Sequence, residues 1–334
     1  MNKLVVQLAE KVLAGELLDR AEGLQLLALP EDDHYDLLYW ANRVRDHFHG
    51  RRVHLCAIAS ARQGGCTEDC KFCAQSSHYR TPAKAHSLLS VEEITKAAER
   101  AEGVGAHCFG IVTSGRSGAS HAKDLEVIIE AVGVLRSRGT IAVGAALGEL
   151  DRTTAMALRS AGVTRYNHNL ETSARHFGSI CTTHTYDDRL RTVRTAKEAG
   201  LEVCCGGIFG MGETAEDRID LALALRRLEV DSVPLNFLNP IPGTPFADMK
   251  SLSPTEILRI IAVYRLMLPW QEIKVCGGRE VNLRALQSWM FYAGASGTMI
   301  GNYLTTLGRA PEEDHQMLRD LNLVAEPTKQ AVGG

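Results

Sequence analysis

The chain alternates short β-type runs with amphipathic helical stretches, and this alternation limits the possible folds more than any other feature. Eight such runs follow an N-terminal region whose apolar residues have helical spacing. The runs begin at these residues: Val53, His107, Thr140, Thr164, Glu202, Ser232, Ile273 and Gly297. Eight strands, each followed by a helix over about 250 residues, are typical of a TIM-type (β/α)8 barrel. A doubly wound open sheet is the alternative, because strand order cannot be read from one sequence.

The stretches between the runs carry signals that start and stop helices. Ser90 with Glu93 and Thr185 with Asp188 each have the spacing of a capping box, which satisfies backbone N–H groups at a helix start. Several stretches close on glycine, as at Gly162, a residue common at helix C-termini. Helices are therefore expected directly after Ser90 and Thr185.

Composition and charge suit one large globular unit. Of 334 residues, 45% are hydrophobic and 23% are charged, which is enough for a sizeable core. We expect an N-terminal helical extension over residues 1–45, the barrel over 46–325 and a flexible tail over 326–334. The N-terminal region mixes charged with apolar residues, which indicates a cytoplasmic protein. The formal net charge is −3 without a basic run, so neither nucleic acid nor a membrane is an expected partner.

Three of the nine cysteines lie close together, just after the first β-type run. An odd number of cysteines in a reducing compartment favours metal or redox chemistry over disulfides. Cys66, Cys70 and Cys73 would need a fourth ligand to close a structural zinc site, and His78 is the candidate. A 4Fe-4S cluster held by three thiolates instead leaves one iron open for a cofactor. In a barrel this loop lies at the C-terminal ends of the strands, where active sites form.

Two motifs together resemble the radical S-adenosylmethionine superfamily. The stretch GCTEDCKFC has the CxxxCxxC spacing, and GGIFGMGE at residues 206–213 fits the pattern GxIxGxxE. Alone, the glycine-rich stretch could equally be a phosphate site or a tight turn. The resemblance implies that the open iron binds the methionine part of S-adenosylmethionine. An electron from the cluster then releases a 5′-deoxyadenosyl radical.

Further stretches resemble the biotin synthase family, over roughly residues 35–325. They are CTEDCKFCAQSSHY, YNHNLETS, TTHTYDDRLRTVRTAKEAG, CGGIFGMGET, SVPLNF, GGRE and LTT. This resemblance implies sulfur insertion into dethiobiotin to form biotin. The radical abstracts hydrogen from a methyl carbon, an auxiliary iron-sulfur cluster supplies the sulfur, and a second cofactor cleavage closes the ring. It also implies a homodimer and an electron donor such as flavodoxin or ferredoxin.

The resemblance assigns site residues by position. It implies that five residues contact S-adenosylmethionine: Phe72, Asn169, Glu171, Arg189 and Ile208. It implies that four contact dethiobiotin: Asn169, Asn236, Thr305 and Thr306. Among these, Arg189 suits the methionine carboxylate and Asn236 the ureido ring, which needs paired donors and acceptors. Phe72 stands where the family often has tyrosine, so a hydroxyl contact is lost and a stacking contact could remain.

The second cluster of this family departs from its usual pattern here. Three cysteines and an arginine commonly hold a 2Fe-2S cluster inside the barrel. The matching positions are Cys108 and Cys204, but also Gly144 and Lys274. The 2Fe-2S site of the family therefore cannot form in its usual way.

Two other cysteines replace the lost ligands. Side chains alternate along a strand, so Cys276 shares a face with Lys274, and Cys204 points opposite to Cys205. The inward set becomes four thiols on four strands: Cys56, Cys108, Cys204 and Cys276. This set resembles a cysteine-richer subgroup of biotin synthases that carries a 4Fe-5S auxiliary cluster. The alternative is that they are buried free cysteines, which are common. Cys181 and Cys205 are interpreted as structural residues.

Two other functions remain open from the sequence. One is another radical barrel enzyme, of the hydrogenase-maturation or methylornithine type, which Asn236, Thr305 and the inward cysteines disfavour. The other is a non-catalytic iron-sulfur scaffold or a zinc-stabilised binding protein. Such a protein would not need the GxIxGxxE pattern or Arg189.

Overall fold

A computed structural model describes residues 1–117 and 122–326, and its centre is a closed parallel barrel. The strands pair in the order β1-β2-β3-β4-β5-β7-β8-β9, β6 pairs with β7, and β1 also pairs with β9, which closes the sheet. The barrel strands are β1 (Arg52–Arg62), β2 (Cys108–Thr113), β3 (Ala142–Ala146), β4 (Arg165–Asn167), β5 (Glu202–Cys204), β6 (Gly207–Phe209), β7 (Ser232–Phe237), β8 (Glu272–Val275) and β9 (Gly297–Met299). Closure confirms the (β/α)8 barrel and rules out the open sheet. A short strand, β10 (Val324–Ala325), pairs with the N-terminal end of β1.

The fifth β-type run is divided, and the prediction of one continuous strand there is wrong. β5 pairs with β7 at Cys204 and Ser232, and β6 resumes the pairing at Gly207 and Leu235. Pro234 lies between these points and has no N–H group to donate to the ladder. The backbone is also very close here, since a Cβ atom on Gly206 would lie 2.0 Å from the carbonyl oxygen of Pro234. The chain therefore bends between β5 and β6.

Helices cover the outside of the barrel. They are α4 (Val91–Gly103), α5 (Ala122–Arg138), α6 (Arg152–Ala161), α7 (Ala174–Phe177), α8 (Tyr186–Glu198), α9 (Ala215–Arg227), α10 (Pro254–Met267), α11 (Arg279–Leu283), α12 (Trp289–Tyr292) and α13 (Pro311–Asp320). Both expected capping boxes are confirmed, at Ser90 with Glu93 and at Thr185 with Asp188. Outward strand residues such as Val143 and Ile111 are buried against this helical layer. Single 3-10 turns occur at Glu31–Asp33 and Arg284–Leu286.

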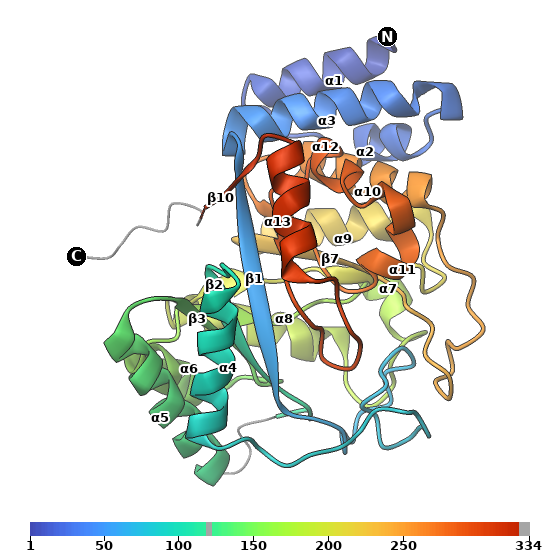
Figure 1. Cartoon of the computed structure of the whole chain (residues 1–334). Helices are drawn as coiled ribbons and strands as arrows, with labels where there is room; N and C mark the ends of the chain where they lie inside the picture. The colour runs from blue at the N-terminus through green and yellow to red at the C-terminus, as the bar shows by residue number, and fades with distance from the viewer. Residues whose placement is uncertain (118–121, 327–334) are drawn as a thin grey trace.

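Three N-terminal helices lie at one end of the barrel: α1 (Lys3–Leu13), α2 (Arg20–Leu27) and α3 (His34–His49). α1 packs on α3, α3 packs on α10, and α2 packs on α9 and α10. Figure 1 shows the three N-terminal helices at the opposite end of the molecule from the loop that follows β1. The helical region continues to His49, past the boundary expected at residue 45. Of the expected tail, only Glu326 lies within the described residues.

Among the described residues, no helix has both the length and the apolar character to cross a lipid bilayer.

Candidate functional site

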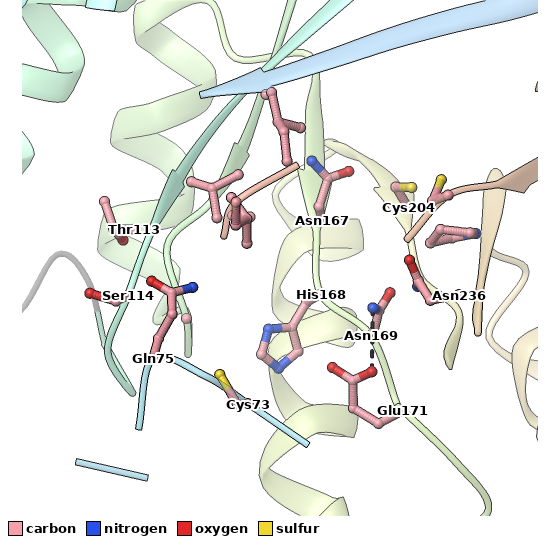
Figure 2. A pocket seen from close by; sticks show the side chains of 18 of the residues that line it. Cys73, Gln75, Thr113, Ser114, Asn167, His168, Asn169, Glu171, Cys204 and Asn236 are labelled. Carbon is pink, nitrogen blue, oxygen red and sulfur yellow. Dashed lines mark hydrogen bonds between the residues drawn. The ribbon is translucent and has the colours of Figure 1, made fainter. Parts of the chain in front are cut away.

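Two adjoining cavities open at the C-terminal ends of the barrel strands. One has a volume of about 370 Å³ and reaches into the barrel, and the other, of about 280 Å³, lies beside it. Cys73, Gln75, Asn169, Glu171 and Asn236 line both of them. Figure 2 shows these side chains pointing into the space between the strand ends. The two cavities therefore form one site in which a cofactor and a substrate can meet.

The loop after β1 presents three thiols at the mouth of the larger cavity. Cys66, Cys70 and Cys73 all line it. Two backbone hydrogen bonds tie the base of the loop, from Gln63 N to His86 O at 3.2 Å and from His86 N to Gln63 O at 3.0 Å. The donor set suits a three-thiolate iron-sulfur cluster, because one short loop brings three thiols to the edge of the same cavity.

The zinc alternative gains no support from His78. Its Nε2 atom lies 2.9 Å from the carbonyl oxygen of Thr67, and the residue is exposed. His78 does not belong to the lining of either cavity described above. A fourth ligand from this side chain would require it to leave that contact and turn inward.

Cys181 lies against the cluster loop, a position that the sequence did not predict. Its Sγ atom is 3.7 Å from Cys70 Sγ and 3.2 Å from His184 Nδ1. The hydrogen bond from the Cys70 thiol, followed by contacts with His184 and Thr183, lowers the pKa of Cys181 to about 4. The same contact raises the pKa of Cys70, and burial raises that of Cys73 to about 11. A bound metal would have to displace those protons.

Glu68 and His184 complete this group, and sequence reasoning missed both. Glu68 Oε2 is 2.6 Å from His184 Nδ1, and Thr183 Oγ1 donates to the same Glu68 oxygen at 2.7 Å. Burial lowers the pKa of the His184 ring, but the hydrogen bond with Cys181 raises it, and the pKa is raised overall. The sequence does place Glu68 between two cysteines of the stretch CTEDC, and His184 within the stretch TTHT. Their meeting could not be read from the sequence, because two separate loops bring them together.

Arg189 extends from α8 into the same site. Its Nη1 donates to the carbonyl oxygen of Asn169 at 2.9 Å, and its Nε donates to His184 Nε2 at 3.1 Å. Glu171 Oε1 lies 3.5 Å from Nη1, and the guanidinium stands 5.6 Å from the centroid of the Phe177 ring. These contacts fix the fork of a buried guanidinium, a geometry that matches a carboxylate.

The segment after β4 contributes polar groups to the cavity wall. Asn169 Nδ2 donates to Glu171 Oε2 at 3.4 Å, the bond drawn in Figure 2, and Asn169 Oδ1 accepts from Gly206 N at 3.1 Å. Glu171 has a φ of 68°, which costs about 1–2 kcal/mol for a residue other than glycine. Burial raises the pKa of its carboxyl group.

His168 is a further lining residue that sequence reasoning missed. Its Nε2 atom is buried without a hydrogen-bond partner among the described residues. Burial lowers the pKa of the ring, so His168 is neutral at ordinary pH. Figure 2 shows the ring between Cys73 and Glu171, where a ligand could meet its free nitrogen.

The GxIxGxxE stretch forms a rigid turn beside the site. Glu213 accepts hydrogen bonds from the backbone N–H groups of Gly210 at 2.9 Å and Met211 at 2.8 Å. A Cβ atom on Gly207 would lie 2.5 Å from the carbonyl oxygen of Glu171, so only glycine fits there. Ile208 lines the smaller cavity between these fixed points.

The remaining predicted contact residues also line the smaller cavity: Phe72, Asn236, Thr305 and Thr306. Asn236 accepts from Gly277 N at 2.9 Å and donates to Gly207 O at 3.1 Å, so strand ends hold its amide. Thr305 is exposed and Thr306 is half-buried. The structure thus brings the predicted cofactor and substrate residues together around one space.

The four predicted inward cysteines line the deeper part of the larger cavity: Cys56, Cys108, Cys204 and Cys276. Cys56 and Cys108 are direct partners in the register of β1 with β2. The hydrogen bond from the Cys108 thiol lowers the pKa of Cys56, and Cys108 itself has a raised pKa. Cys205 is fully buried in the barrel wall, which confirms its opposite orientation to Cys204.

Lys274 and Gly144, which stand where the family has cluster ligands, also face the barrel interior. The Nζ atom of Lys274 lies 3.0 Å from Cys56 Sγ and 2.6 Å from Glu272 Oε1. A Cβ atom on Gly144 would lie 3.7 Å from Cys108 Sγ, so a side chain there would also point inward. Lys274 and Arg165 bring positive charge to a space lined by thiols. Such charge stabilises thiolates and, with them, an anionic cluster.

Comparisons with known proteins agree with this geometry. A family model described as the Radical SAM superfamily matches residues 61–225, and one described as the Biotin and Thiamin Synthesis associated domain matches residues 234–324. The biotin synthase of Geobacter sulfurreducens is 55% identical over 316 residues, which cover 95% of this chain and 96% of that protein. The biotin synthase of Geobacter metallireducens is 52% identical over 334 residues, with 100% and 99% coverage.

Solved structures share the architecture. Methylornithine synthase (PylB) has a TM-score of 0.84 at 22% identity, covering 96% of this chain and 97% of its own. The hydrogenase maturase HydG from Carboxydothermus hydrogenoformans has a TM-score of 0.82 at 19% identity, covering 96% and 79%. At such identities the likeness extends to the fold alone.

The closed barrel and its three-thiol loop define a radical S-adenosylmethionine enzyme. Within this class, the chain shares more than half of its sequence with known biotin synthases over nearly its whole length. It therefore belongs to the biotin synthase family. This membership implies S-adenosylmethionine and a 4Fe-4S cluster as its cofactors.

Proposed function

We propose that this chain converts dethiobiotin to biotin by radical insertion of sulfur, with an auxiliary iron-sulfur cluster as the sulfur source. One observation carries the proposal: two separate sets of thiols line one cavity, three at its mouth and four in its interior. Residues suited to a cofactor and a substrate lie between the two sets. A reaction that joins a carbon radical to a sulfide needs this order in space.

Cys66, Cys70 and Cys73 would hold the 4Fe-4S cluster. When bound with S-adenosylmethionine, this cluster supplies the electron that generates the radical. Arg189 would orient the methionine carboxylate, while Asn169 and Glu171 would contact the ribose. Phe72 and Ile208, which line the smaller cavity, would pack against the cofactor from that side.

The interior set would hold an auxiliary cluster with four protein ligands: Cys56, Cys108, Cys204 and Cys276. Support comes from their common cavity and from the inward positions of Gly144 and Lys274. Four thiolates can hold either a 2Fe-2S or a 4Fe-4S core. A cluster of the 4Fe-5S type is proposed because its added sulfide could leave while the core keeps its ligands. Lys274 would donate a hydrogen bond to the Cys56 thiolate.

Dethiobiotin would lie between the two sets of thiols. Asn236 would face its ureido ring together with Asn169, and Thr305 and Thr306 would meet its carboxylate. The strand ends hold the Asn236 amide in place, so this contact needs little reorganisation on binding. The chain's contribution is to position the substrate and to exclude water and oxygen from a reactive carbon.

The experiment is an anaerobic incubation of iron- and sulfide-reconstituted protein with dethiobiotin, S-adenosylmethionine and a strong reductant. Mass spectrometry should detect biotin together with 5′-deoxyadenosine, at about two deoxyadenosines per biotin. Deoxyadenosine without biotin would contradict the proposed substrate or the auxiliary cluster. If neither biotin nor 5′-deoxyadenosine formed, the result would contradict the proposed radical chemistry.

An acidic electron carrier such as flavodoxin or ferredoxin would dock beside the cluster loop. Residues 70–91 contain Lys71, Arg80 and Lys84 but no aspartate or glutamate, in a chain with 40 acidic residues. Arg80 and Lys84 are exposed. This local positive charge complements an acidic protein and would raise the rate of association. A homodimer is proposed from the family resemblance only.

Reversing the charge at Arg80 and Lys84 to glutamate should slow flavodoxin-driven deoxyadenosine formation about tenfold at low salt. Cleavage driven by dithionite should not change, because a small chemical reductant needs no docking surface. The matched control reverses Lys3 and Arg43, which are exposed on helices at the far end of the molecule. Equal slowing in both double variants would contradict a docking site at the loop.

A further inference from the structure

Cys70 and Cys181 are spaced as ligands of one metal ion. Their sulfur atoms lie 3.7 Å apart. A tetrahedral zinc ion with Zn–S bonds of about 2.3 Å places two sulfurs about 3.8 Å apart. The two sulfurs are joined by a hydrogen bond at this spacing, and a cation bound between them would take the place of its proton.

His184 supplies a third ligand atom at the same place. Its Nδ1 atom is 3.2 Å from Cys181 Sγ, and one atom from each of Cys70, Cys181 and His184 lies within 4.8 Å of the others. All three side chains are buried. Glu68 Oε2 lies 2.6 Å from His184 Nδ1 but is not one of these ligand atoms, so water would complete the four-coordination of a tetrahedral ion.

We propose that Cys70, Cys181 and His184 form a binding site for a thiophilic divalent cation such as Zn²⁺ when the cluster is absent. Both sulfurs bind as thiolates, the Cys70 thiol releases its proton to solvent as its metal–sulfur bond forms, and no oxidant or reductant is needed. Water is the fourth ligand. The site shares Cys70 with the proposed cluster, so the chain holds either the cation or the cluster.

Binding at this site also changes the environment of Arg189. At present Arg189 Nε donates to His184 Nε2 at 3.1 Å. Once Nδ1 binds a cation, Nε2 of the neutral ring carries the proton and can no longer accept that bond. Arg189 must then turn away from His184. The cation would therefore displace both a cluster ligand and the proposed partner of the methionine carboxylate.

The test measures Zn²⁺ affinity of the cluster-free full-length chain by competition with a chromophoric chelator. Every protein carries Cys56→Ala and Cys108→Ala, because these thiols form a second group with His54 that could bind metal. Cys181→Ala and His184→Ala should each weaken Zn²⁺ binding at least about 100-fold. Cys66→Ala and Cys73→Ala should change it less than about threefold, because neither residue belongs to the proposed site.

The opposite pattern would overturn the proposal, since it would mean that zinc binds the three cysteines of the loop. Unchanged binding in Cys181→Ala and His184→Ala, or no tight binding by the parent, would also overturn it. Circular dichroism shows whether each variant keeps its fold. Co²⁺ gives a second readout, because the parent should show tetrahedral bands with thiolate charge transfer that Cys181→Ala reduces. This binding assay is independent of the proposed function, although the exclusion of the cluster rests on it.

Discussion

Replacing Cys276 with alanine is expected to stop biotin formation while S-adenosylmethionine cleavage continues. Cys276 lines the deep end of the larger cavity and is buried, whereas the three thiols at the mouth come from another loop. Removing it takes one ligand from the proposed auxiliary cluster and none from the cluster that cleaves the cofactor. Biotin should fall below about 1% of the wild-type amount, and 5′-deoxyadenosine should stay within about threefold.

Cys205→Ala is the matched control for this variant. Cys205 is as deeply buried as the interior thiols but packs in the barrel wall, facing away from the cavity. The Cys205→Ala variant should retain biotin formation. Iron analysis adds an independent readout, because Cys276→Ala should lose about half of the bound iron and Cys205→Ala none. Retained biotin formation by Cys276→Ala would refute its role as a cluster ligand.

Arg189→Met is the second variant with a large expected effect. It should weaken S-adenosylmethionine binding about 100-fold, or about 2.7 kcal/mol, as measured by calorimetry on the anaerobic cluster-loaded protein. The guanidinium side chain is only 11% exposed, so its pairing with a carboxylate is little screened by water. The methionine side chain keeps much of the volume of arginine but has no hydrogen-bond donor.

Arg191→Met controls for the loss of positive charge on the same helix. Arg191 contacts Asp188, and its side chain is 64% exposed. An exposed ion pair contributes about 0–1 kcal/mol, so affinity for the cofactor should hardly change. Similar weakening in both variants would show that net charge, and not a direct contact by Arg189, governs binding.

The barrel could be predicted because each strand and helix leaves a local pattern in the sequence. Periodicity gave eight runs and capping gave the helix starts, and the structure confirms both. The division of the fifth run was missed because its cause lies on another strand, where Pro234 faces Gly206. A local pattern cannot report such a contact between strands.

Contacts between loops limited the prediction of the site in the same way. Alternation along a strand separated Cys204 from Cys205, since it needs only the strand itself. The surroundings of Cys181 could not be predicted, because its neighbours Cys70 and Asp69 lie more than a hundred residues away in the chain. No spacing rule connects them, and only the folded barrel brings both loops to one end.

The backbone tie between Gln63 and His86 has a consequence for how the protein could survive the loss of its metal. The two hydrogen bonds join the ends of the cysteine loop to each other at its base. The entropy of closing the loop is therefore already compensated by the barrel before any iron arrives. The segment between these residues can open and close as a local unit, on a smaller free-energy scale than global unfolding. In hydrogen-exchange experiments, removing the iron should release protection in this segment while the barrel amides stay slow.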